Sequence, residues 1–239
     1  MAGQNRLIAI GDIHGCAFAL DALLEVIAPG VDDTIVVLGD FIDHGRDTKA
    51  VVDRLIQLES QCRLVCLRGN HEEMLMASLI TEDARRFWCN AGGVATIFSY
   101  RFGGSIRDIP TDHLEFISEC RDYLETDRHI FVHANFDPRL PMVAQPTHLL
   151  RWAMLEPEEA ACHESGKTVI CGHTEQAGGE ILDLDCIKCI DTACWRYGWL
   201  TALDVHSGQT WQTSRFGVLR EPHQPTARVP DVSGQPPRV

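Results

Sequence analysis

Five apolar segments of this sequence end in residues that could bind a metal ion. GDFIDHG (residues 39–45) places two carboxylates three positions apart, directly after an apolar run. Carboxylate, imidazole and amide oxygen together are the ligand types of a divalent transition metal, not of a thiolate structural zinc site. A single Asp or His after a strand is more often a turn or cap residue, but five such endings favour one shared site. The candidates are Asp12, His14, Asp40, Asp43, Asn70, His71, His133 and His173.

The segments that carry these residues read as alternating strands and helices. Apolar or β-branched runs predict strands at 7–11, 34–39 and 63–69, and apolar residues at helical spacing predict helices at 18–28, 50–59 and 71–80. This alternation predicts βαβ units and a mostly parallel sheet with helices on its faces. Further strands are predicted at 129–135, 168–174, 187–192 and 199–205. Because sites in open α/β sheets form at the carboxyl ends of strands, the candidates should lie together.

Two stretches fall outside this pattern. From about residue 81 to 128 the sequence becomes helical and irregular around FWCNAGGVATIFSYRFGG, which predicts a helical cap inserted beside the sheet. Residues 219–239 contain five of the eleven prolines and no apolar periodicity, so we expect a disordered tail. The catalytic domain is therefore expected to span residues 1–218.

Composition limits the class of partner. Hydrophobic residues make up 45% and charged residues 23% of the 239 residues, which is ordinary for a soluble globular protein. A net charge of −13 argues against a surface for duplex nucleic acid. No apolar stretch approaches the roughly 20 residues needed to span a bilayer, and the N-terminal segment lacks the features of a signal peptide. We therefore expect a cytoplasmic protein without a membrane partner; the oligomeric state is left open.

The cysteines are interpreted in the same context. Ten cysteines in a cytoplasmic protein favour reduced core residues rather than a disulfide framework. Cys186 and Cys189 form the one CxxC pair. With no second pair nearby, two buried strand cysteines are a better interpretation than a zinc ribbon.

The motifs GDIHG, GDFIDHG, RGNHEE, VHAN and CGHT, in this order, resemble the calcineurin-like metallophosphoesterase superfamily. They are most similar to its phosphoprotein phosphatase branch, which includes bacterial serine/threonine phosphatases and diadenosine tetraphosphatases. The resemblance implies an α/β fold of two β-sheets flanked by helices, a four-layer αββα sandwich, with two divalent metal ions between the sheets. Mn²⁺ is the expected ion, with Fe or Zn as alternatives.

The resemblance also implies roles for individual residues. Asp12 and His14 should bind the first metal ion and Asp40 should bridge both ions. The second ion should be completed by Asn70, His133 and His173. Two such ions activate water and clamp a phosphoryl group.

Beside the metal ligands, the resemblance assigns an acid and a phosphate-binding cation. His71 should be the general acid that protonates the leaving oxygen, and Asp43 should hold its imidazole in the required tautomer. Arg68 matches the family arginine that binds phosphate oxygens through its guanidinium fork.

Four positions depart from the family pattern or do not match it cleanly. His44 stands where the phosphatase branch normally has Arg, and Arg46 stands where Pro is common. Either Arg46 partly replaces the missing charge, or phosphate binding is weaker and more pH-dependent; a solvent-facing His44 is the simpler alternative. Arg151 is the candidate for the second family arginine, although its spacing from Trp152 does not match cleanly. Asn135 replaces a usual glycine.

Three functions are compatible with these motifs. The first is hydrolysis of phosphomonoesters, with phosphoserine or phosphothreonine in proteins as substrate and small aryl phosphates as possible surrogates. The segment FWCNAGGVATIFSY supports it, because it resembles the matching stretch of bacterial protein phosphatases. The second is hydrolysis of dinucleoside polyphosphates such as diadenosine tetraphosphate. The third, a catalytically silent phosphopeptide-binding protein, is disfavoured because every expected ligand is present.

Overall fold

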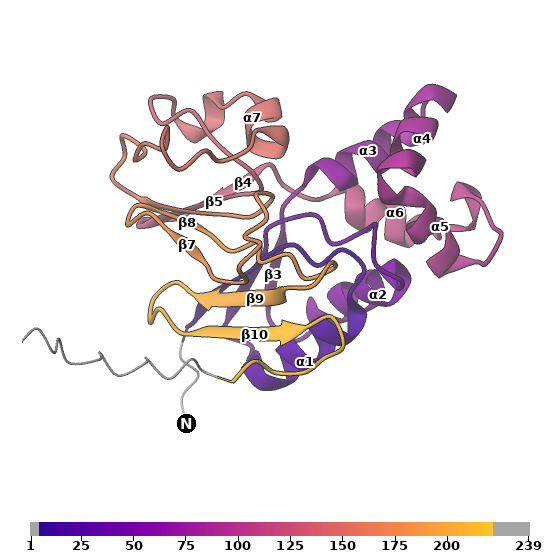
Figure 1. The fold of residues 1–239 in the computed structure, drawn as a ribbon, viewed down its shortest axis with the longest axis horizontal. Coiled ribbons are helices and arrows are strands. Elements are labelled where there is room, and N and C mark those ends of the chain that lie inside the picture. The colour runs from indigo at the N-terminus through magenta and orange to yellow at the C-terminus, as the bar shows by residue number, and fades with distance from the viewer. Residues whose placement is uncertain (1–4, 222–239) are drawn as a thin grey trace, which may run out of the picture.

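Two five-stranded β-sheets pack face to face, with helices on their outer faces (Figure 1). The computed structural model describes residues 5–221. Helices α1 (Ala17–Ile27) and α2 (Thr48–Leu58) cover the outer face of one sheet, and α7 (Thr147–Trp152) lies over the other. This architecture confirms the predicted fold class of two sheets flanked by helices.

The first sheet has the strand order β10-β9-β1-β2-β3. Its parallel centre consists of β1 (Leu7–Ile10), β2 (Thr34–Val37) and β3 (Arg63–Cys66). Strand β9 (Trp199–Asp204) runs antiparallel to β1, and β10 (Thr210–Ser214) runs antiparallel to β9. The first three strands all end at the same edge, where their following loops meet.

The second sheet has the order β4-β5-β6-β8-β7. Its parallel strands are β5 (His129–Val132), β6 (Thr168–Cys171) and β8 (Ile187–Cys189). The antiparallel edge strands are β4 (Tyr123–Glu125) and β7 (Leu182–Asp183).

Alternating side chains of the central strands fill two separate apolar layers. In β1, Ile8 and Ile10 pack toward α1 and α2, whereas Leu7 and Ala9 face the second sheet. Successive strand residues point to opposite faces, so a strand buried on both sides is apolar throughout, as LIAI is. The two-sided burial leaves polar residues to the loops at the strand ends.

Helices occupy most of the segment after β3. They are α3 (Asn70–Ser78), α4 (Glu82–Trp88), a π-helical turn (Cys89–Gly93), α5 (Val94–Tyr100), a 3₁₀ turn (Ile106–Asp108) and α6 (Thr111–Ser118). A second 3₁₀ turn, Met142–Ala144, precedes α7. Trp88 is fully buried at the end of α4, directed toward the loop that follows β2. The segment expected to form a cap thus contributes a side chain to the ends of the strands.

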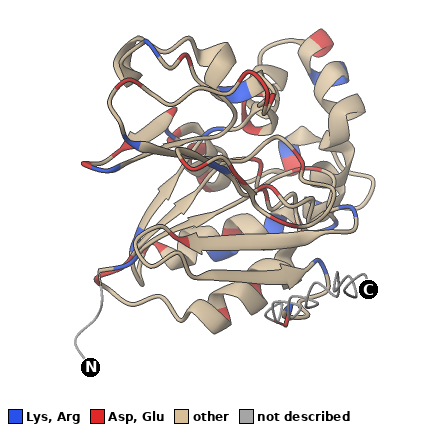
Figure 2. Ribbon diagram, turned by 60° about the vertical axis from the view of Figure 1, so that its left-hand side comes forward, with Lys and Arg blue, Asp and Glu red and all other residues tan. Residues whose placement is uncertain are grey.

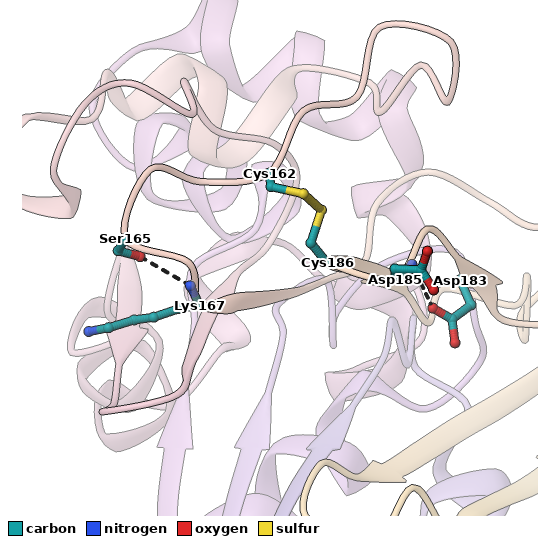
Figure 3. The surroundings of a disulfide bond; sticks show 6 residues. All are labelled: Cys162, Ser165, Lys167, Asp183, Asp185 and Cys186. Atoms are coloured by element: carbon teal, nitrogen blue, oxygen red, sulfur yellow. Dashed lines mark hydrogen bonds between the residues drawn. A yellow bond between two sulfur atoms is a disulfide. The ribbon is translucent and has the colours of Figure 1, made fainter.

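The cysteines correct one expectation. Cys162 and Cys186 form a disulfide that joins the loop after α7 to the start of β8 (Figure 3). Cys162 is exposed and Cys186 only partly buried, so the prediction of reduced cysteines, with Cys186 buried in a strand, was wrong for this pair. The cause is the loop path, which brings two residues 24 positions apart within bonding distance. Cys189 is buried in β8, as expected.

The chain ends add two observations. Residues 222–239, most of the expected tail, lie outside the described residues. Leu219 and Arg220 pair with β10, so regular contacts continue past residue 218. Within residues 5–221, no helix combines the length and apolar character needed to cross a membrane.

Candidate metal centre

The loops after β1, β2, β3, β5 and β6 bring the predicted ligands together at one edge of the two sheets. They surround a cavity of about 440 Å³. Asp12 and His14 follow β1, Asp40 follows β2, Asn70 begins α3, and His173 follows β6; all five line the cavity. His133, after β5, is fully buried beside them.

Glycine allows two of these loops to approach closely. Gly39 has a φ of +107°, and a Cβ there would lie 2.7 Å from the nitrogen of Gly69. A Cβ on Gly69 would lie 2.1 Å from Oδ1 of Asp40. Glycine suits the left-handed backbone at position 39 and the lack of space at both positions, so these residues let Asp40 reach the centre.

The ligand atoms form two groups that share one residue. Donor atoms of Asp12, His14 and Asp40 lie within 4.8 Å of one another, and so do those of Asp40, His133 and His173. The amide of Asn70 lies 3.2 Å from Nε2 of His133. Asp40 therefore stands where a carboxylate could bridge two ions.

Each histidine of these groups has one nitrogen engaged and one left for a metal. Nδ1 of His14 donates to the carbonyl of Ile42 (2.9 Å), and Nδ1 of His133 donates to that of Leu38 (2.9 Å). Nε2 of His173 donates to the carbonyl of Trp152 (3.1 Å). Such contacts fix the tautomer and the ring orientation of a metal-binding histidine.

The charged and titratable side chains of the centre also suit divalent ions. Burial, together with the nearby carboxylates of Asp191 and Asp40, raises the pKa of Asp12 well above its usual range. Burial opposes ionisation of Asp40, but the imidazoles of His133, His71 and His14 outweigh it and lower its pKa. Its Oδ2 lies 3.8 Å from Nε2 of His14 and 3.5 Å from Nε2 of His133. Crowded carboxylates and imidazoles of this kind are compensated by metal ions.

His71 and Asp43 form a buried pair beside the ligands. Nδ1 of His71 donates to Oδ2 of Asp43 (2.8 Å). Burial disfavours the charged imidazole, but the carboxylates of Asp40 and Asp43 raise the pKa of His71 to about 9. Nε2 of His71 lies 3.9 Å from Oδ2 of Asp40, and the residue lines the cavity. A protonated nitrogen is thus available there at neutral pH.

Two residues of the helical segment hold Asp43, and the sequence did not indicate either contact. Nε1 of Trp88 donates to Oδ2 of Asp43 (2.8 Å), and Oγ1 of Thr96 donates to Oδ1 (2.6 Å). Both residues come from FWCNAGGVATIFSY, which sequence analysis connected with substrate class. Their direct contact is instead with the carboxylate behind His71.

Three acidic residues of the centre were not among the candidates. The carboxylate of Glu72 accepts from the backbone nitrogens of Gly69, Asp40 and Phe41, and burial raises its pKa to about 8. Asp191, after β8, and Glu175 line the cavity. Burial raises the pKa of Asp191 to about 7. For Asp191 the sequence did contain a signal, because the predicted strand at 187–192 ends in polar residues, as the other predicted strands do.

The structure does not bring the three predicted phosphate-binding arginines to the cavity. Nη2 of Arg68 donates to the carbonyl of Ser118, and Arg46 is exposed. Arg151 pairs with Glu73 (2.8 Å) and with Asp122. Within residues 5–221, the arginine that lines the cavity is Arg196, which also pairs with Glu175 at 3.1 Å. Figure 2 shows Lys and Arg interspersed with Asp and Glu along the loops.

His44 lines the cavity and does not simply face solvent. Its ring stacks on the indole of Trp195, with centroids 4.2 Å apart and planes inclined by 10°. Burial and the nearby His71 lower the pKa of His44. It therefore presents a mainly neutral imidazole where the phosphatase branch has a cation.

Two mixed sheets with acidic and histidine side chains at their shared edge form a candidate centre for divalent metal ions. Residues 5–177 match the model of the calcineurin-like phosphoesterase family. The chain therefore belongs to this family of metal-dependent hydrolases, as its motifs predicted.

Curated relatives match over parts of the chain. A symmetrical bis(5'-nucleosyl)-tetraphosphatase from Burkholderia pseudomallei (strain 668) is 27% identical over 135 residues, or 55% of this chain and 43% of that protein. One from Acidovorax sp. (strain JS42) is 40% identical over 73 residues, or 30% of this chain and 25% of that protein. The chain thus spans less than half the length of these relatives.

Solved structures support the fold. A structure described as a putative diadenosine tetraphosphatase aligns with a TM-score of 0.66 at 20% identity, covering 89% of this chain and 94% of that chain. A protein serine/threonine phosphatase from Saccharomyces cerevisiae aligns with a TM-score of 0.59 at 16% identity, covering 84% and 73%.

Proposed function

We propose that this protein hydrolyses phosphoric anhydride or ester bonds with two bound divalent ions and His71 as general acid. The ions would be held by Asp12, His14, Asp40, Asn70, His133 and His173. When bound, they supply charge neutralisation and an activated water. Mixed oxygen and nitrogen donors suit Mn²⁺, which we propose as the native ion, and also Fe or Zn.

The observation that carries this proposal is the buried pair of His71 and Asp43. Asp43 is fully buried and accepts the Nδ1 proton at 2.8 Å, so the imidazole ring is fixed. Nε2 is left to face the cavity and holds a proton at neutral pH, because the pKa of His71 is about 9. A general acid needs this arrangement: a fixed ring and a proton within reach of the leaving oxygen.

For the substrate, we favour dinucleoside polyphosphates. A phosphomonoester dianion is best bound by guanidinium forks, and Arg46, Arg68 and Arg151 are not among the residues that line the cavity. An internal phosphate of a polyphosphate has one ionised oxygen, so the phosphoryl group under attack carries less charge than a phosphomonoester dianion. The names of the Burkholderia pseudomallei and Acidovorax relatives support the same class.

Phosphoserine or phosphothreonine in proteins is the second candidate. It is favoured by the segment FWCNAGGVATIFSY, in which Trp88 and Thr96 support Asp43. In this case Arg196, which lines the cavity, would bind the phosphate dianion.

Product analysis distinguishes the two substrates. The full chain is stripped of metal, given Mn²⁺, and incubated with diadenosine tetraphosphate or a phosphoserine peptide. We expect ADP from the dinucleotide with kcat/KM at least tenfold above that for phosphate release from the peptide, and loss of both in His71→Asn. The reverse ratio would select the protein phosphatase function. No turnover of either substrate with any metal would refute the hydrolase proposal.

A further inference from the structure

Three histidines that line the cavity form a nearly equilateral triangle. The ring centroids of His14, His44 and His71 are separated by 4.9, 4.8 and 4.9 Å. One ring nitrogen of each lies within 4.8 Å of those of the other two. We call these three residues the imidazole triangle. It is distinct from the two ligand groups above, because His44 and His71 belong to neither.

Contacts behind each ring hold the triangle in place. His14 and His71 each donate their Nδ1 proton to a neighbour, the carbonyl of Ile42 and the carboxylate of Asp43. This leaves their Nε2 atoms for the centre of the triangle. His44 is held by its stack on Trp195, and on another side a Cβ at Gly92 would lie 2.8 Å from its Nδ1. Rings held in this way lose little side-chain freedom when they bind a ligand.

Three converging imidazoles are a ligand set for Zn²⁺. Zinc binds three protein ligands and a water in open tetrahedral sites, with Zn–N distances of about 2.0–2.1 Å. Such bonds place the nitrogens about 3.4 Å apart, so the rings would move together slightly from their present separation. All three members are imidazoles, which suit zinc better than the oxygen-preferring Mg²⁺ and Mn²⁺. Oδ2 of Asp40 lies beside two of them, 3.8 Å from Nε2 of His14 and 3.9 Å from Nε2 of His71.

Occupation of the triangle would oppose catalysis in two ways. His14 has one free nitrogen, so it cannot bind zinc in the triangle and an ion beside Asp12 and Asp40 at the same time. Zinc bound to Nε2 of His71 would occupy the atom left to face the cavity, so this nitrogen could not contact a leaving group. The second consequence rests on the general-acid role proposed above.

We propose that the imidazole triangle is a third, inhibitory metal site that takes Zn²⁺, and that His44 creates it. The other two members are part of the family motifs, whereas the phosphatase branch has Arg at position 44. Arginine is permanently charged and cannot bind a cation. His44 supplies the third imidazole of the group, so zinc sensitivity should depend on this residue.

The test titrates Zn²⁺ into the Mn²⁺-loaded full chain and follows p-nitrophenyl phosphate hydrolysis. Each variant is compared with its own rate before zinc. In His44→Arg and His44→Phe, the zinc concentration for half-inhibition should rise at least tenfold. The matched control is His148→Phe, which removes an exposed imidazole and should not change it. Equal inhibition of wild type and both His44 variants would overturn the proposal.

A binding measurement keeps the proposal separate from the enzyme activity. Zinc bound per chain is counted after equilibrium dialysis in excess Mn²⁺, and X-ray absorption reports its ligands. We expect wild type to bind zinc with about three imidazoles in its first shell, and both His44 variants to lose this site. If the protein shows this zinc site but hydrolyses no substrate, the proposed function fails and the proposed zinc site stands. If zinc in wild type is bound mainly by carboxylates, the triangle is not the site.

Discussion

Replacing Asp43 by Asn tests whether His71 acts as a general acid. Asp43 is fully buried, and its Oδ2 accepts from both His71 and Trp88 at 2.8 Å. A hydrogen bond to a charged group contributes about 1.5–3 kcal/mol. The neutral amide loses this stabilisation of the imidazolium, so kcat should fall by roughly 10- to 160-fold at neutral pH.

The pH profile should change in a definite direction. The carboxylates of Asp40 and Asp43 raise the pKa of His71 to about 9 in the protein as it stands. Activity that needs the protonated ring is present below this pKa and is lost as pH rises through it. Without the negative charge of Asp43 the pKa falls, so Asp43→Asn should lose activity at a lower pH than wild type.

The assay compares two aryl phosphates at saturating Mn²⁺. Phenolate is a strongly basic leaving group that needs a proton, whereas p-nitrophenolate needs little help. We therefore expect the full loss of kcat with phenyl phosphate and a much smaller loss with p-nitrophenyl phosphate. Asp21→Asn, which neutralises a largely exposed carboxylate on α1, is the control. Equal losses with both substrates would refute the general-acid role of His71.

Three further changes have measurable outcomes. Trp88→Phe keeps the aromatic packing but removes the hydrogen bond from Nε1 to Asp43, which still accepts from His71 and Thr96; we expect a loss of about 1–2 kcal/mol and a melting temperature about 2–8 °C lower by calorimetry. Arg196→Ala removes an arginine that lines the cavity. Because this charge is exposed, KM should rise only about fivefold, and less at high salt. An unchanged KM would exclude Arg196 from phosphate binding. Cys162→Ser opens a loop of 24 residues and should cost about 3 kcal/mol in urea unfolding, a difference from wild type that should vanish when both are measured in reducing agent.

Strands and ligands were predictable where the signal is local. Each central strand is buried on both faces, so it reads as an apolar run that stops where polar residues begin. The edge strands β4, β7 and β10 were not predicted. In β10, TWQTS mixes polar and apolar residues because one side of the strand is only partly covered. Short edge strands of this kind have little pattern to detect.

The positions of the predicted phosphate-binding arginines and the disulfide depend on partners that are distant in the sequence. Arg151 pairs with Glu73 and Asp122, which come from two other segments. Long side chains choose among such partners only after the chain has folded, so motif spacing could not exclude Arg151 from the cavity. Cys162 and Cys186 likewise meet through the path of a loop. Their pairing has no signature in the spacing of ten cysteines.

The backbone of the metal centre is the feature that local sequence rules are least able to predict. Five of the eight described non-glycine residues with positive φ lie here: His14, Asp40, Asp43, His44 and His173. A left-handed conformation at such residues costs about 1–3 kcal/mol each and persists only when the surroundings enforce it. Here the surroundings are buried acceptors and donors from other segments: Glu72 binds the nitrogen of Asp40, and Asp12 accepts from that of His173. Asp12 holds the loop of His173 and also lines the cavity as a candidate ligand, so the contacts that keep the strained backbone in place also aim the ligands.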